Sequence, residues 1–203
     1  FDLFLSREFP AVEFERYADD AVVHCVTERQ AREVWAALAE RLDSVGLRLH
    51  PDKTKIVYCK DTKRRGSFEQ VSFTFLGYTF RPRMSRQKDG RFYVGFLPAV
   101  SPEALKAMGT QVRDWRIHLR TGLNLTELAA RINPIVLGWM NYYGRFYRSA
   151  LHRFLQHINT YLMRWAQKKY RRLRSFKRFR AWWTALVARE PGPFRHWAWT
   201  SAF

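Results

Sequence analysis

Acidic residues are scarce in this sequence, and cysteine is nearly absent. The 203 residues include 18 Asp and Glu against 36 Lys and Arg, with only two cysteines. Neither Cys25 nor Cys59 stands in a Cys-x-x-Cys pair or near clustered histidines, so neither a zinc site nor a disulfide framework is expected. We expect two buried, reduced thiols, as in a cytoplasmic protein.

Long hydrophobic runs are also lacking. No stretch of about 18 consecutive apolar residues occurs and no signal peptide opens the chain, so no membrane segment is expected. Apolar residues make up 47% and aromatic residues 16% of the chain, which is enough for a buried core and argues against disorder. The opening FDLFLSREFP is typical of a protein interior, which predicts that the sequence is a fragment of a longer protein.

The excess of positive charge is concentrated after residue 60. Residues 1–60 hold 9 basic and 11 acidic side chains, whereas residues 61–203 hold 27 basic and 7 acidic ones. A globular segment with such an excess repels itself unless a polyanion neutralises it, and nucleic acid is the usual polyanion. Charge alone leaves an anionic membrane surface as the other option.

The apolar pattern predicts an α+β region over residues 1–100. Residues 13–26 predict a β-hairpin with a tight Ala-Asp-Asp turn. Residues 27–46 predict a helix, with Thr27 as its N-cap and Gly46 as its stop. Further strands and loops are expected in the rest of this region: strands over 47–50, 54–59, 71–80 and 91–100, and basic loops over 61–70 and 81–90.

Residues 101–203 are predicted to form a helical domain. Ser101 at an N-cap and Pro102 at the first helical position indicate its beginning. Asn124 with Glu127 predicts a capping box, and Pro134 either starts a new helix or kinks a continuing one. Helices are expected over 102–120, 125–133, 134–146, 149–170 and 175–189, and the segment 191–193 is expected to stop the last one.

Two adjacent acids, Asp19 and Asp20, stand at the tip of the predicted hairpin. Neighbouring carboxylates repel each other and would be partly desolvated by the strands beside them, which favours a bound cation. Carboxylate oxygens suit Mg²⁺, and two such ions can activate a 3′-hydroxyl and stabilise a pyrophosphate leaving group. An Asp-Asp pair is also common as an ordinary polar turn.

Three motifs in order resemble the reverse transcriptase family. The YADD sequence at 17–20, followed by Ala-Val-Val-His, is similar to the family's catalytic hairpin. GLRLHPDKTKI at 46–56 resembles the next palm motif of the group II intron branch, and FLGY at 75–78 resembles the primer-grip hairpin. The resemblance implies an α+β fold, namely a partial palm of antiparallel strands with a helix, followed by a helical thumb and maturase domain.

The resemblance also implies roles for individual residues. Asp19 would be the direct metal ligand and Asp20 its less direct neighbour. The residues expected near the nucleotide or the primer are Tyr17, Ala18, Lys53, Lys55, Leu76 and Gly77. Exposed lysines are the default, which favours ordinary solvated side chains for both, and the segment around Gly77 could be a simple core hairpin as well as a primer contact.

The family's other metal-binding aspartate lies on an earlier strand, for which only Asp2 is available. Asp2 is too close to the hairpin and is interpreted as structural. The fingers and the front of the palm are therefore expected to be missing, and this fragment alone is expected to have no polymerase activity.

INPIVLGWMNYY at 132–143 resembles the core of the maturase domain of group II intron proteins. Its aromatic side chains fall at helical spacing, which is also typical of a packed bundle. From Arg145 to the end, fourteen Lys and Arg face one acid, so phosphate contacts are favoured over a merely solvated face. The cations predicted to bind RNA are Arg145, Arg148, Arg164, Lys168, Lys169, Arg171, Arg172, Arg174, Lys177, Arg178 and Arg180.

The resemblance as a whole implies an RNA-directed DNA polymerase and splicing maturase. It implies Mg²⁺, deoxynucleoside triphosphates, a DNA primer or target, and intron RNA as both template and partner. A homodimer is compatible with it and a membrane partner is not expected. The alternatives are a non-catalytic RNA-binding splicing factor with this fold, and another bacterial reverse transcriptase such as a retron or diversity-generating type.

Overall fold

The computed structural model describes residues 1–64 and 66–202 in two compact units. The first unit comprises Phe1–Phe75 with Arg81–Phe96, and the second comprises Leu76–Phe80 with Leu97–Phe203. The described elements are antiparallel strands and α-helices, so the predicted α+β fold class is confirmed. Each unit is described by itself below.

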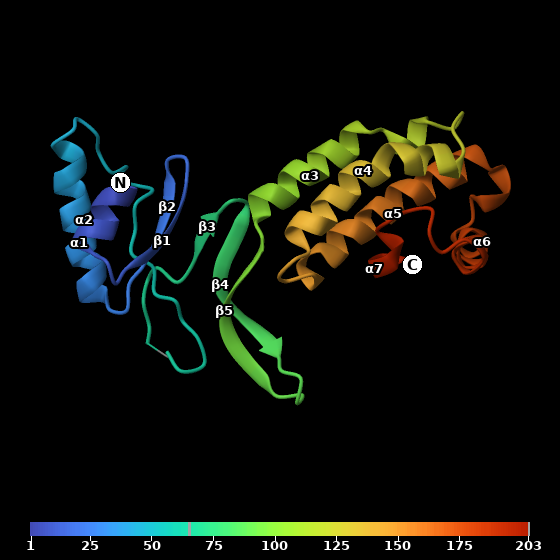
Figure 1. Ribbon diagram of the computed structural model, residues 1–203. Helices are drawn as coiled ribbons and strands as arrows, with labels where there is room; N and C mark the ends of the chain where they lie inside the picture. The colour runs from blue at the N-terminus through green and yellow to red at the C-terminus, as the bar shows by residue number, and fades with distance from the viewer. Residues whose placement is uncertain (65, 203) are drawn as a thin grey trace. The chain divides into compact units, whose positions relative to one another are not determined.

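In the first unit, two helices pack beside the hairpin (Figure 1). The helices are α1 (Asp2–Glu8) and α2 (Glu28–Asp43), and the hairpin is formed by β1 (Glu13–Tyr17) and β2 (Asp20–His24). The small core of this region contains Leu5, Val12, Val34 and Leu38. As predicted, the Thr27 hydroxyl caps α2 by accepting from the Gln30 N–H.

The predicted strands over 47–50 and 54–59 are wrong, because these residues form turns and irregular chain. Gly46 has a φ of 75°, and the Leu47 N–H turns back to the Leu42 carbonyl, so the chain reverses as it leaves α2. The Thr54 N–H then donates to the His50 carbonyl around a second turn. Turn hydrogen bonds thus replace the ladder that the apolar pattern predicted.

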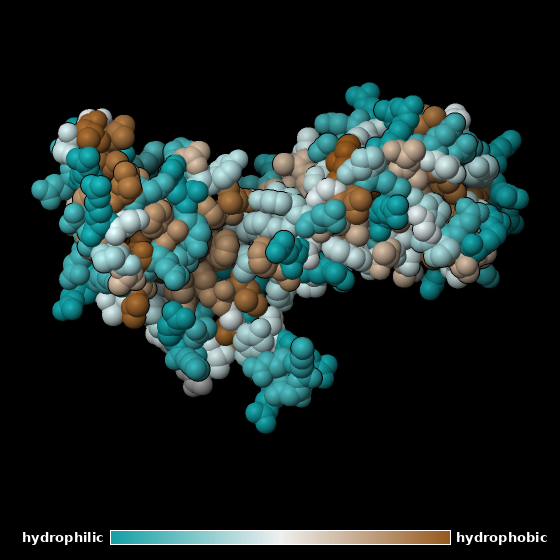
Figure 2. Space-filling view, in the orientation of Figure 1, coloured by the Kyte–Doolittle hydropathy of each residue, from teal (hydrophilic) through white to brown (hydrophobic). Residues whose placement is uncertain are grey.

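A three-stranded sheet follows in the order β3-β4-β5. Its strands are β3 (Phe73–Phe75), β4 (Tyr78–Arg86) and β5 (Phe92–Val100). The predicted single strand over 71–80 is wrong, because Leu76 and Gly77 both have positive φ and reverse the chain within it. The predicted loop over 81–90 is also mostly strand, closed by a short turn after Arg86 that Figure 2 shows as a hydrophilic projection.

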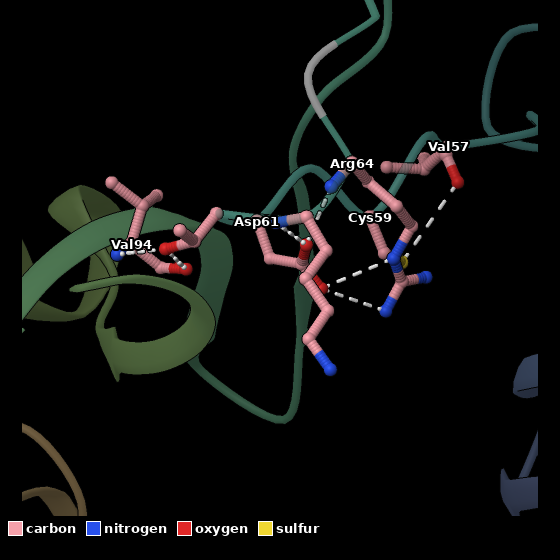
Figure 3. Close-up of polar contacts among 7 residues, drawn as sticks. Val57, Cys59, Asp61, Arg64 and Val94 are labelled. Atoms are coloured by element: carbon pink, nitrogen blue, oxygen red, sulfur yellow. Dashed lines mark hydrogen bonds and ion pairs between the residues drawn. The ribbon is translucent and has the colours of Figure 1, made fainter.

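The beginning of the predicted basic loop over 61–70 is folded against β5 (Figure 3). The Asp61 carboxylate accepts from the N–H groups of Lys63 and Arg64, each at 2.8 Å, and it pairs with the Arg64 guanidinium. These hydrogen bonds, chiefly that from the Arg64 backbone, hold the pKa of Asp61 below its ordinary value. Thr62 exchanges backbone and hydroxyl bonds with Val94, which ties the loop to the strand.

The helical part of the second unit begins where the sequence predicted. The Ser101 hydroxyl caps α3 and the capping box of Asn124 and Glu127 starts α4. The elements are α3 (Pro102–Asp114), η1 (Ile117–Leu119), α4 (Leu125–Tyr143), α5 (Ser149–Lys169), η2 (Arg171–Leu173), α6 (Phe176–Arg189) and α7 (Trp197–Thr200).

Two helix boundaries differ from the prediction. The helix expected over 102–120 ends at Asp114, because Arg116 adopts a left-handed conformation with a φ of 48°. The two helices expected on either side of Pro134 are one continuous helix, α4. Pro134 is exposed, so its ring costs a backbone hydrogen bond without forcing the helix to end.

Helix α5 forms the centre of the helical unit, and it contacts α3, α6, α7 and both 3₁₀ turns. Its fully buried side chains recur at three- and four-residue spacing: Leu151, Leu155, Ile158, Leu162 and Trp165. Burial of each such side chain stabilises the fold by about 2 kcal/mol. Over residues 1–64 and 66–202, no helix is long and apolar enough to cross a membrane.

Candidate metal and nucleic-acid sites

The predicted carboxylate pair lies at a two-residue turn. Ala18 and Asp19 connect β1 to β2, and Tyr17 stands opposite Asp20 in the antiparallel register. Ala18 has a φ of 53°, a left-handed conformation that costs about 1 kcal/mol for a residue other than glycine. Backbone strain of this kind clusters at functional sites.

A cation directly behind the turn holds it. Arg16 donates from one terminal nitrogen to the Ala18 carbonyl at 2.8 Å, and it binds both carboxylate oxygens of Asp2 at 2.7 and 2.8 Å. The hydrogen bond from Arg16 is the main reason that the pKa of Asp2 lies below its ordinary value. Asp2 is thus engaged in a structural ion pair, consistent with its interpretation from the sequence.

Both acids of the pair are exposed to solvent, so the expected partial desolvation is wrong. Among the described residues, no salt bridge engages Asp19 or Asp20, which leaves their oxygens free for a cation. Mg²⁺ commonly takes one or two protein carboxylates and completes its shell with water and phosphate oxygens, so this pair fits the ion. In the part of the chain that the structure describes, no group of three or more metal-ligating side chains gathers.

The two lysines predicted near the nucleotide are exposed, on the chain that follows α2. Lys53 lies in the turn closed by the bond between Thr54 and His50, and Lys55 follows that turn. Their position near a triphosphate remains a prediction.

The Leu76–Gly77 turn belongs to the second unit, and that unit holds both of its carbonyl groups. The Tyr142 hydroxyl donates to the Leu76 carbonyl at 2.9 Å, and the Ser101 N–H donates to the Gly77 carbonyl at 2.9 Å. Above the turn, Tyr143 lies so close to Gly77 that an added Cβ would meet its hydroxyl oxygen at 2.8 Å. The sequence did not indicate this role for either tyrosine.

Tyr78 packs into the same aromatic cluster. Its ring centroid lies 5.2 Å from that of Tyr142, 5.5 Å from that of Tyr143 and 5.4 Å from that of Phe146. The Tyr78 hydroxyl donates back to the Tyr142 carbonyl. Burial is the main reason that the pKa values of Tyr78 and Tyr143 are raised, so both hydroxyls stay protonated near neutral pH.

The rest of the maturase-like core packs within the bundle. Trp139 stacks on Trp115 with ring centroids 5.6 Å apart and meets Phe154 edge-on. Asn133, in the same segment, donates to the Pro193 carbonyl and accepts from the Arg195 N–H. This segment therefore organises the helical unit and anchors the chain that follows α6.

Asn159, to which no sequence pattern assigned a role, lies buried at the centre of a polar cluster. Its Oδ1 accepts from Nε1 of Trp197 at 3.1 Å and Nε2 of His196 at 2.8 Å, and its Nδ2 donates to the Thr200 carbonyl. Because the Trp197 indole can only donate, the atom of Asn159 that it meets must be the amide oxygen Oδ1. Nε2 of His196 meets the same oxygen, so the His196 proton must lie on Nε2. Burial lowers the pKa of His196 to about 3, so its ring is neutral.

Most of the cations predicted to bind RNA are exposed, from the end of α4 to α6. Three of them lie over aromatic rings: the Arg148 guanidinium is 4.3 Å from the Trp199 centroid, that of Arg164 is 5.6 Å from the Tyr161 centroid, and Nζ of Lys169 is 5.4 Å from the Trp165 centroid. Lys169 differs from the two arginines, because it is half-buried and donates to the Leu123 carbonyl at 2.6 Å. Glu190, the one acid from Arg145 to the end of the chain, pairs with Arg189, so the described cations mostly lack acidic partners.

An exposed carboxylate turn in an α+β unit and a cationic helical unit are the features expected of a reverse transcriptase with a maturase region. The family model described as reverse transcriptase (RNA-dependent DNA polymerase) matches residues 3–80, and that described as group II intron, maturase-specific domain matches residues 105–183. The chain belongs to the group II intron reverse transcriptase and maturase family. Comparisons with curated proteins and with solved structures give no match.

Proposed function

We propose that this chain carries the catalytic hairpin of an RNA-directed DNA polymerase and the RNA-binding region of a splicing maturase. The observation that carries the proposal is the free, exposed pair Asp19 and Asp20 on a strained turn inside the reverse transcriptase match. We assign the C-terminal part of the palm to residues 1–100, and the helical thumb and RNA-binding maturase domain to residues 101–203. The partners are a deoxynucleoside triphosphate, a DNA primer and intron RNA, met in a reducing cytoplasm.

Asp19 and Asp20 would hold Mg²⁺, and Arg16 keeps their turn in its left-handed form. The bound ion would supply charge stabilisation for the developing 3′-oxyanion and the pyrophosphate. Two acids are too few to complete a two-metal centre, and Asp2 is bound to Arg16. We therefore expect no template-dependent DNA synthesis by the 203-residue chain alone, and its detection would contradict this part of the proposal.

Metal binding by the hairpin is tested with Mn²⁺ as a paramagnetic probe of the ¹⁵N-labelled chain. We expect the amide signals of Ala18, Asp19 and Asp20 to broaden first, and the Asp19→Asn/Asp20→Asn variant to lose this broadening. Asp52→Asn is the matched control, since Asp52 is an exposed acid in a different turn of the same unit. Equal broadening in the wild type and the double variant would favour the non-catalytic splicing factor.

RNA binding by the helical unit is tested by titrating labelled intron RNA and random RNA at two salt concentrations. Each phosphate neutralised by a cation releases counterions, so affinity should fall steeply as salt rises. Removing one contacting cation, for instance with Arg178→Gln, should reduce the logarithmic salt slope by about 0.7 to 0.9. Glu103→Gln in α3 is the control, because it changes the surface without removing a cation. An affinity that does not fall as the salt concentration rises would exclude phosphate contacts.

A further inference from the structure

The Leu76–Gly77 turn is built from residues that do not favour its shape. Both residues have positive φ, 50° at Leu76 and 75° at Gly77. Two-residue hairpin turns of this form strongly prefer Asn-Gly or Gly-Gly, because glycine has no Cβ to crowd the backbone at positive φ and the short polar side chain of asparagine can bond locally. Leucine at that position is strained, and it must be held by contacts from elsewhere.

The contacts that hold it come from the end of α4, 66 positions further along the chain. The Tyr142 hydroxyl donates to the Leu76 carbonyl, which orients the peptide plane between Leu76 and Gly77. The Tyr78 hydroxyl donates to the Tyr142 carbonyl, so the bonds run in both directions between turn and helix. Among the described residues, no other side chain donates to the Leu76 carbonyl.

We propose that Tyr142 is a positioning residue for the primer turn, which it keeps in the strained left-handed form that presents the Leu76 side chain to a nucleic-acid strand. This inference rests on the proposed function, since it takes the primer to pass the Leu76–Gly77 turn. Leu76 is 39% exposed, so its side chain is accessible to such a strand. The tyrosines that end the maturase core thereby determine the shape of a polymerase element.

Tyr143 adds a steric reason for glycine at the second position of the turn. Its hydroxyl oxygen occupies the space that a Cβ on Gly77 would need. The half-buried Tyr143 ring thus lies against Gly77, while Tyr142 holds the carbonyl before it. Helix α4 contributes a hydrogen bond and a packing surface to the same two residues.

The first arm of the test measures the turn itself in the 203-residue chain. Tyr142→Phe removes the hydroxyl and keeps the ring, and we expect amide hydrogen exchange over residues 75–78 to rise about fivefold, as for the loss of one ordinary hydrogen bond. The matched control is Tyr161→Phe in α5, whose ring packs beside His157 in the same unit. Unchanged exchange at the turn in Tyr142→Phe would overturn the proposal.

The second arm measures whether the primer lies against the Leu76–Gly77 turn. A primer–template duplex carrying 4-thiothymidine near the primer 3′ end is photo-crosslinked to the chain, and the peptide that receives the label is identified. We expect labelling of the segment that contains Leu76 in the wild type, and at least a fivefold lower yield in Tyr142→Phe at equal total binding measured by fluorescence anisotropy. Tyr161→Phe should give the wild-type yield.

The two arms separate the failure of this inference from the failure of the proposed function. If the wild type gives no label near Leu76, the primer does not pass this turn and Tyr142 cannot position the turn for it. If the wild type is labelled and Tyr142→Phe gives the same yield despite faster exchange, the proposed function stands and Tyr142 has only a structural role. Faster exchange with a reduced label supports the proposal.

Discussion

Arg16 and Asp2 form a bidentate ion pair beside the turn of the β1–β2 hairpin, with nitrogen–oxygen distances of 2.7 and 2.8 Å. The same guanidinium holds the Ala18 carbonyl in the turn that carries Asp19. The shape of the carboxylate turn therefore depends on a helix residue 14 positions before Arg16.

Arg16→Gln should raise the pKa of Asp2 toward its ordinary value, because the hydrogen bond from Arg16 is the main cause of its depression. The depressed pKa contributes stability above the unfolded-state value, and this contribution is lost as pH falls through the folded-state pKa. Carboxyl ¹³C NMR titration measures the shift. Arg32→Gln, which removes the ion pair with Glu28 in α2, should leave the Asp2 titration unchanged.

Gly77→Ala should destabilise the second unit by about 1 to 2 kcal/mol, because its φ is 75° and the new Cβ would meet the Tyr143 hydroxyl. Chemical denaturation of each variant gives the free energy of unfolding. The control is Gly109→Ala in α3, where a Cβ meets nothing within 4 Å and alanine is the better helix former. If steric contact contributes, the double variant Gly77→Ala/Tyr143→Phe recovers part of the loss.

Asn159→Ala should cost about 3 kcal/mol or more in unfolding free energy. The change leaves the His196 and Trp197 donors and the Thr200 carbonyl buried without their partner, and each such group costs about 1 to 3 kcal/mol. Gln156→Ala, at an exposed position of the same helix, should change stability little. A loss for Asn159→Ala no larger than that of the control would contradict the polar cluster.

The stability of the helical unit should fall as pH decreases below 6.5. The unfolded chain protonates His196 near 6.5, whereas burial lowers the folded-state pKa to about 3, so the unfolded state binds more protons between these values. This one group should remove about 2 kcal/mol between pH 7 and pH 5. Denaturation at several pH values measures the slope, which His196→Gln should reduce and His157→Gln, at an exposed position, should not.

Local signals in the sequence were sufficient for the capping residues and for the hairpin. Thr27, Ser101 and Asn124 cap the helices that follow them, because capping joins residues only three positions apart. The hairpin register and the cationic character of the helical region are also local properties. The boundaries predicted at Pro134 and in residues 47–59 were wrong, because α4 continues through the exposed proline and turn hydrogen bonds take the place of the expected strands after α2.

The sequence by itself determined the family, the α+β and helical regions, the acids on their turn and the placement of charge, since each depends on residues that are close together in the chain. Only the tertiary structure decided that Arg16 forms an ion pair with Asp2, that Asn159 accepts hydrogen bonds from His196 and Trp197, and that Tyr142 donates to the Leu76 carbonyl. It also placed residues 76–80 with the helical unit. Side chains up to 66 positions apart meet in these contacts, and no short-range pattern records which distant partner a hydroxyl or a guanidinium will find.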